Sequence, residues 1–222
     1  MSERSRCVCI KLLGCIFVLS LFAACSPLED SNLKDLRDQA NANANGTPGL
    51  SYTPDDNNTA YSVSIGAADA VKIIIPASNN SLPVTAIDAG GFSGYTIMTS
   101  IVIPDSVMTI GNSAFLGCTG LKSVIIPEGV TSIVEKTFSG CTGLTSITIP
   151  AGVTIIGDNA FSGCGLTIIY YGGADLQTWG RIQKTNTGNA PIQNSGIIYC
   201  YSDTKPVSGH FWHWVGTTPA VW

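Results

Sequence analysis

Apolar and polar residues alternate in short runs that recur at a fixed spacing between Ile101 and Gly165. Each run reads Ile-x-Ile-Pro-x-x-Val-x-x-Ile or a close variant, and the runs that start at Ile101, Val124 and Ile147 are 23 residues apart. Alternation sends the first and third residues of a strand to one face and the second to the other. Self-similarity at a short fixed period is the signature of a solenoid. The pattern therefore predicts a mainly β solenoid with a parallel sheet on one face.

Each repeat contains the same set of predicted elements. Leu121 to Ile126 and Leu144 to Ile149 read Leu-x-x-Ile-x-Ile, the strand pattern of a leucine-rich repeat. A second apolar wall, expected as a short second strand, comprises Val107, Val130, Val153, Ile110, Ile133 and Ile156. Residues 158–163 are expected to form one helical or 3₁₀ turn, since 23 residues leave no room for a long helix. An aromatic core column is expected from Phe92, Phe115, Phe138 and Phe161.

The ends of the array depart from this regularity. A divergent first copy begins at Ile73, and an insertion over residues 78–83 lengthens it to 28 residues. Before it, residues 51–53 and 61–65 alternate around a polar turn, which predicts a hairpin that caps the first coil. We expect an N-terminal cap over residues 49–72, leucine-rich repeats over 73–171 and a C-terminal cap or tail over 172–222.

The first 24 residues are typical of a bacterial export signal. Arg4, Arg6 and Lys11 precede a largely apolar run that ends in Ala-Ala-Cys25, which is too short for an ordinary membrane-spanning helix. Cysteine directly after two alanines resembles a lipoprotein signal, although Phe22 is larger than the residue usual there. This resemblance implies cleavage before Cys25 and its acylation, followed by a flexible tether over residues 25–48; the alternative is an ordinary secretory signal cut nearby.

The chain has eight cysteines, but their placement does not predict a disulfide framework. Three lie in the signal, Cys25 follows it, and Cys118, Cys141 and Cys164 occupy one column of the repeat, which leaves Cys200 alone. A cysteine in the same position of each coil behaves as a small buried hydrophobic residue. Pairing between stacked cysteines remains open at this stage.

The repeat Ile-x-Ile-Pro-x-x-Val-x-x-Ile-Gly-x-x-Ala-Phe-x-Gly-Cys resembles the BspA-type leucine-rich repeats of bacterial surface antigens, which also occur in treponemal lipoproteins. The resemblance covers about residues 73–171, and the segments 170–179 and 209–222 are similar to the ends that often close such arrays. It implies a role in cell-surface adhesion and binding of host proteins. One departure is Tyr95, which stands where the later repeats have cysteine.

Candidate catalytic chemistry is sparse. His210 and His213 have no third metal ligand nearby, and no nucleophile, phosphate-binding loop or cofactor motif is recognisable. The net charge is −4; Arg4, Arg6 and Lys11 against Glu3 give the first 24 residues +2, so the remainder carries −6. An acidic chain without a basic cluster argues against nucleic-acid binding. We therefore expect neither an enzyme nor a metal or cofactor site.

The outward residue of each strand is the best candidate for a binding face. These residues should line up on the exposed sheet about 4.8 Å apart, and four of the five are apolar or aromatic: Ile74, Val102, Ile125, Thr148 and Tyr170. Apolar stripes of this kind often mark interaction surfaces; the alternative is that the tether or the C-terminal tail covers the stripe. Trp212, Trp214 and Trp222 fit either C-terminal packing or a sugar-stacking patch.

The sequence thus predicts a non-catalytic cell-envelope lipoprotein, lipid-anchored at the outer membrane or cell surface, that binds a host or neighbouring-cell protein through its sheet face. Two alternatives remain open: a periplasm-facing structural scaffold, and a glycan-binding module that uses the C-terminal tryptophans.

Overall fold

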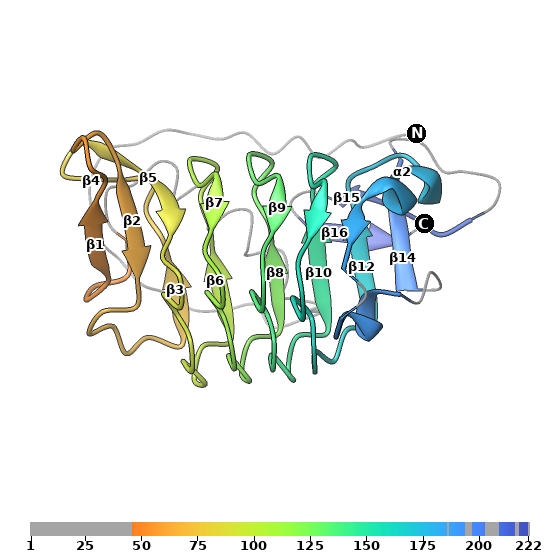
Figure 1. Ribbon diagram of the computed structural model, residues 1–222, viewed down its shortest axis with the longest axis horizontal. Helices are drawn as coiled ribbons and strands as arrows, with labels where there is room; N and C mark the ends of the chain where they lie inside the picture. Colours follow the sequence, from red (N-terminus) through yellow and green to blue (C-terminus); the bar gives the residue numbers. More distant parts are fainter. Residues whose placement is uncertain (1–45, 186, 194–196, 203–208, 216–217, 222) are drawn as a thin grey trace, which may run out of the picture.

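The computed structural model describes residues 46–185, 187–193, 197–202, 209–215 and 218–221. Successive coils stack along one axis and place their first strands side by side in a parallel sheet (Figure 1). These strands are β3 (Lys72–Ile74), β6 (Ser100–Val102), β8 (Ser123–Ile125), β10 (Ser146–Ile149) and β12 (Ile168–Tyr171). The predicted leucine-rich-repeat solenoid is confirmed.

A second wall runs on the opposite side of the core, as predicted. It is built from β7 (Thr109–Ile110), β9 (Ser132–Ile133), β11 (Ile155–Ile156) and β13 (Gln183–Lys184). β9, β11 and β13 pair in parallel, and β7 pairs with β5 (Leu82–Ile87) of the first repeat. Ile110, Ile133 and Ile156 point into the core because the strand alternation places every second residue there, whereas Ile155 faces outward and is 44% exposed.

The side that carries the phenylalanines consists of tight turns and not of the predicted helical or 3₁₀ turn, although some of its N–H groups close i→i+3 hydrogen bonds within the coil, as Ser162 does to Asn159 O at 3.1 Å. The backbone N–H of Phe138 donates to Ala160 O of the next coil at 2.8 Å instead of closing a helical turn within its own coil. Asn159 and Gly163 have positive φ angles of 54° and 72°, and Lys136 has one of 55°. Left-handed residues at this spacing interrupt a helix, so this side is a series of tight turns that hydrogen-bond from coil to coil.

The core is a stack of identical layers. Neighbouring phenylalanine rings along the column lie 5.5, 5.2 and 5.6 Å apart with interplanar angles of 15° or less, and all four are fully buried: Phe92, Phe115, Phe138 and Phe161. Such offset stacks add to the free energy gained by burying the rings. The predicted aromatic core column is therefore confirmed.

The N-terminal cap contains the predicted hairpin. β1 (Ser51–Pro54) pairs antiparallel with β2 (Tyr61–Ser64), and β2 pairs parallel with β5, so the hairpin extends the second wall. The insertion of the first repeat forms a second small hairpin, in which β4 (Ser78–Asn79) pairs with the start of β5. Its two loop residues, Asn80 and Ser81, have positive φ angles, as a tight hairpin turn requires.

The C-terminal cap continues the solenoid beyond Tyr171 before closing it. The helix α2 (Leu176–Arg181) leads into β13, and the 3₁₀ turn η1 (Ala190–Ile192) leads into β14 (Ile198–Tyr201), which pairs parallel with β12. β15 (Phe211–Val215) then pairs with β14, and β16 (Thr218–Val221) pairs antiparallel with β15. The last two strands form a hairpin, here called the C-terminal hairpin.

Candidate partner-binding face

The five predicted face residues lie in one column across the parallel sheet. The strand register pairs Ile74 with Val102, and it pairs Thr148 with both Ile125 and Tyr170. Tyr199 of β14 continues the same row beyond Tyr170. The sheet therefore brings these side chains onto one face.

The column divides into parts of different accessibility. Ile74, Ile125 and Tyr170 are half-buried, whereas Val102 and Thr148 are only 4% and 7% exposed. Burial at Ile74 arises partly from the segment just before β1, since Thr47 exchanges hydrogen bonds of 2.7 and 2.9 Å with its backbone. The apolar stripe is thus narrower than the alternation of the sequence suggests.

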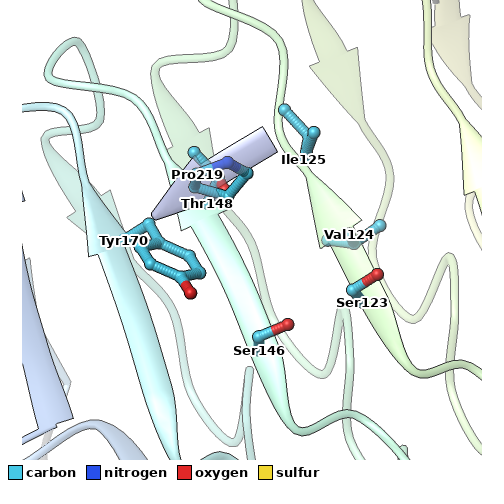
Figure 2. A pocket seen from close by; sticks show the side chains of 7 residues that line it. All are labelled: Ser123, Val124, Ile125, Ser146, Thr148, Tyr170 and Pro219. Carbon is cyan, nitrogen blue, oxygen red and sulfur yellow. The ribbon is translucent and has the colours of Figure 1, made fainter. Parts of the chain in front are cut away.

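The C-terminal hairpin covers one end of this face. Pro219 of β16 lies beside Thr148 and reaches toward Ile125, while Tyr170 flanks it (Figure 2). The groove left between the hairpin and the sheet holds only about 40 Å³. That volume suits a few water molecules and is too small for a sugar ring. The sequence left open the alternative that the C-terminal tail covers the apolar stripe, and the structure shows this cover over β10 and β12.

A row of hydroxyl groups lies beside the apolar column, and the sequence reading did not single it out. Ser100, Ser123 and Ser146 face each other across β6, β8 and β10, all half-buried, with Lys72 at one end of the row and Ile168 at the other. The signal was present, because serine stands two residues before the outward column residue in three repeats. The face is therefore apolar along one row and hydroxylated along the next.

Trp212 fixes the C-terminal hairpin to the sheet. Its indole Nε1 donates to Tyr171 O at 2.8 Å, and its ring meets those of Tyr170 and Tyr201 edge-on at 5.5 and 5.1 Å. Only 2% of Trp212 is exposed, so this ring packs the cap and has no free face for a sugar. The side chain of Trp214 and the whole of Trp222 lie outside the described residues.

The cysteine column supplies hydrogen bonds to the core. Cys118, Cys141 and Cys164 each donate a thiol hydrogen to a phenylalanine carbonyl of the preceding coil at 3.0 Å. In the first repeat the Tyr95 hydroxyl donates to Ala70 O at 3.1 Å from the corresponding position. These three cysteines and Cys200 are free thiols, so no disulfide joins the coils. Burial raises the pKa of Cys164 to about 12.

The two histidines are not brought to a common metal site. His210 is exposed and stacks on Tyr199 at 5.1 Å, while His213 lies on β15. Among the described residues, no group of three or more histidine, cysteine or acidic side chains is placed to hold a metal ion.

A profile of the BspA type leucine-rich repeat region matches residues 69–181 with six copies. The chain belongs to this family. Leucine-rich repeats of this type generally act as non-enzymatic binding scaffolds, and bacterial proteins that carry them are often found at the cell surface. The match extends past Tyr171, in keeping with the continuation of the coil into α2.

Solved structures of similar fold come from several bacteria. The T. pallidum leucine-rich repeat protein has a TM-score of 0.57 at 21% identity, and the match covers 69% of each chain. A leucine-rich repeat protein from Bacteroides capillosus has a TM-score of 0.51 at 30% identity, covering 56% of this chain and 95% of that one. A search of curated proteins finds no match.

The predicted signal over residues 1–24, the lipidated Cys25 and most of the tether lie outside the described residues. Within the described ranges, no helix has the length and apolar character needed to cross a bilayer.

Proposed function

We propose that this protein is a lipid-anchored protein of the bacterial cell envelope that binds a protein partner through the part of the sheet beyond the C-terminal hairpin. The observation that carries the proposal is the division of the face. The hairpin lies over Thr148 and Tyr170 and ends beside Ile125. Ile125 and Ile74 are half-buried beside a row of half-buried serines, and Val102 between them is 4% exposed. Solenoids commonly bind partners on such open sheet faces.

The chemistry of this open part favours a protein over a small molecule. It presents branched apolar side chains next to the hydroxyl groups of Ser100 and Ser123, and the groove at its edge, beside Pro219 of the hairpin, holds only about 40 Å³. Small-molecule sites are usually clefts of several hundred Å³ that enclose the ligand. A flat surface of mixed apolar and hydroxyl groups instead suits the broad contact of a protein interface.

The anchor is the second part of the proposal. The apolar run that ends in Ala23-Ala24-Cys25 supports acylation of Cys25, because it resembles a lipoprotein signal. Two or three acyl chains on Cys25 then bind the protein firmly to a bilayer. Mass spectrometry of the purified native protein should find a diacylglyceryl group on an N-terminal Cys25. Recovery of an unmodified N-terminus at another residue would contradict the anchor.

The orientation of the anchored domain separates adhesion from a periplasmic scaffold. Protease treatment of intact cells should degrade the solenoid while a periplasmic control protein survives. Antibody labelling of intact cells is the control, because it distinguishes a domain inside the cell envelope from a surface domain that resists protease. If the domain resists protease and excludes antibody until the cells are opened, the partner lies in the periplasm and adhesion is wrong.

Blocking variants test the face itself. Ser123→Arg places a long charged side chain on the open part of the sheet, where the native side chain is half-buried and outside the core. Ser132→Arg makes the same change on the second wall and serves as the matched control. Ser123→Arg should reduce adhesion of cells to purified surface proteins of host and neighbouring cells about tenfold or more, because a change at the centre of an interface commonly has an effect of this size. Ser132→Arg should leave adhesion unchanged. Equal adhesion by both variants would contradict the proposal.

A further inference from the structure

A larger cleft lies on the other side of the C-terminal hairpin, at the ends of the sheet strands. Its volume is about 180 Å³, and it is lined by Glu128, Thr148, Pro150, Gly172, Tyr201 and Trp212. Only Thr148 is shared with the shallow groove at Pro219. The two therefore form separate recesses on the same sheet.

The cleft exists because the repeat pattern changes where the cap begins. The residue that follows the strand is proline in the regular repeats, but Gly172 occupies this place after β12. Its backbone N–H donates to Ile149 O at 2.9 Å, and an added Cβ would lie 2.9 Å from the backbone nitrogen of Ala151. Glycine therefore allows the two coils to approach closely here, and no proline ring lines the cleft at this position.

The walls of the cleft are fixed and aromatic. Trp212 is held by its hydrogen bond to Tyr171 O and forms the back wall, and the half-buried Tyr201 ring packs on it edge-on at 67°. A cation near an aromatic ring is attracted by the ring quadrupole, and the attraction grows as water is removed. Trp212 is only 2% exposed, so the half-buried Tyr201 ring is the aromatic surface that a positively charged group in this recess would meet.

Glu128 supplies the complementary charge at the rim. It is exposed, and among the described residues the ion pair that forms joins Lys136 to Glu135, so within this part of the chain no basic side chain neutralises Glu128. A carboxylate beside aromatic rings is a common arrangement for ammonium and guanidinium groups, since the hydrogen bonds to it are charge-assisted. The net charge of −4 also attracts a basic partner.

We propose that this cleft binds the basic side chain, ammonium or guanidinium, of the protein partner. The proposal rests on the proposed function, because it assigns to the partner a lysine or arginine that enters beside the hairpin while the remaining surface contacts the open sheet. Glu128 pairs with the cation, the Tyr201 ring lies against the aliphatic part of the side chain, and Trp212 holds that ring in place.

A titration with small amides tests the cleft without the partner. The full chain is titrated with Nα-acetyl-arginine methylamide, Nα-acetyl-lysine methylamide and the uncharged Nα-acetyl-norleucine methylamide while the Trp212 indole N–H resonance is followed by NMR. Saturable shifts with a Kd on the order of 10 mM are expected for the two cations. Norleucine amide should bind about fivefold more weakly or not at all, because it lacks the charge.

Charge-neutralising variants locate the site. Glu128→Gln should weaken binding of both cations about fivefold, whereas Asp158→Asn, which removes one exposed carboxylate on the turn side, should leave it unchanged. Equal binding of norleucine amide, indifference to Glu128→Gln, or absence of saturable shifts would each overturn the proposal. If the cleft does not bind the cations, Ser123→Arg should still reduce adhesion. If the protein does not mediate adhesion, the NMR shifts should still be observed. The two proposals can therefore be tested separately.

Discussion

The regular coils and the C-terminal cap solve the same hydrogen-bonding problem by different means. Within the coils, the N–H of each core phenylalanine donates to a backbone carbonyl of the next coil, as Phe115 does to Thr137 O at 2.9 Å. At the last phenylalanine this partner is replaced by a side chain. Phe161 N–H donates to Asn189 Oδ1 at 3.1 Å, and Asn189 Nδ2 donates to Gly157 O at 2.8 Å.

Asn189 thus acts as a substitute peptide group. Its carboxamide oxygen accepts as a backbone carbonyl does, its NH₂ group has two hydrogens that donate to Gly157 O and Thr185 O, and only 1% of the residue is exposed. At the other end of the array, Tyr95 similarly replaces the thiol of the cysteine column. The comparison teaches that a repeat stacks through its backbone, whereas the ends of the stack depend on individual side chains that no repeat pattern specifies.

The largest expected effect comes from removing a central ring of the repeated core. Phe138→Ala should lower the free energy of unfolding by roughly 3–5 kcal/mol, because it leaves a cavity between two stacked rings. Phe92→Ala should cost about 1 kcal/mol less, since Phe92 has a single stacking partner in the column. Chemical denaturation measures both. A near-unchanged stability of the Phe138 variant would remove this residue from the core.

The next effect tests the cap. Asn189→Ala should destabilise the protein by about 2 kcal/mol, because the Phe161 N–H becomes buried without a partner and the Gly157 carbonyl loses one of its two donors. Asn112→Ala, an exposed asparagine in the regular coils, is the matched control and should change stability by no more than about 0.5 kcal/mol. Hydrogen exchange should accelerate at the Phe161 amide in the first variant. Equal stability of the two variants would show that the cap does not depend on this carboxamide.

A smaller and more local effect is expected at the hairpin. Trp212→Phe keeps an aromatic ring but removes the donor to Tyr171 O, which should cost about 1–2 kcal/mol. Because the contact lies at the end of the solenoid, amide exchange should rise in β15 and β16 and stay unchanged at Phe138. An equal rise in both places would mean that the hairpin and the coils unfold as one unit.

The smallest effect concerns the buried thiols. Burial raises the pKa of Cys164 to about 12 and that of Cys200 to about 11, so roughly 10⁻⁴ of Cys164 is thiolate at pH 8. Alkylation of the folded chain at pH 8, read at each site by mass spectrometry, should spare both residues until denaturant is added. Rapid modification of folded Cys164, which is partly buried, would contradict its raised pKa.

The same pKa shift fixes the sign of a pH dependence. The thiol of the unfolded chain titrates near its ordinary value of 9.0, below the folded pKa of Cys164. Deprotonation therefore favours the unfolded state first, and the stability contributed by this group is complete below about pH 8.5 and lost as the pH rises toward 12. Cys164→Ala should reduce the fall in stability over this range.

The sequence was sufficient for the features that repeat. The 23-residue period, the Ile-x-Ile alternation and the phenylalanine column each recur several times, so the inward residues, the second wall and the family could be predicted. The predicted helical turn did not form because hydrogen bonds within the coil alternate on this side with hydrogen bonds to the next coil, and the pattern of one repeat contains no information about that neighbour.

The rest depends on contacts that occur once. The alternation places Val102 and Thr148 outward, but it contains no information about what lies above them. Pro219, which covers the sheet, and Trp212, which fixes the hairpin, belong to a tail that does not repeat. Asn189 is needed because the backbone hydrogen bonds between coils end at Phe161. The predicted face residues therefore form a column, while the accessibility of Thr148 and Tyr170 is set by residues more than forty positions away.

The most direct test of the proposed binding face is site-specific photo-crosslinking on intact cells. A benzophenone amino acid is placed at Ser123 on the open part of the sheet or at Ser132 on the second wall, and the cells are irradiated in contact with their natural surroundings. The account predicts a discrete protein adduct from position 123 and none from position 132. No adduct at position 123, or the same adduct at both positions, would contradict a partner bound to the sheet face.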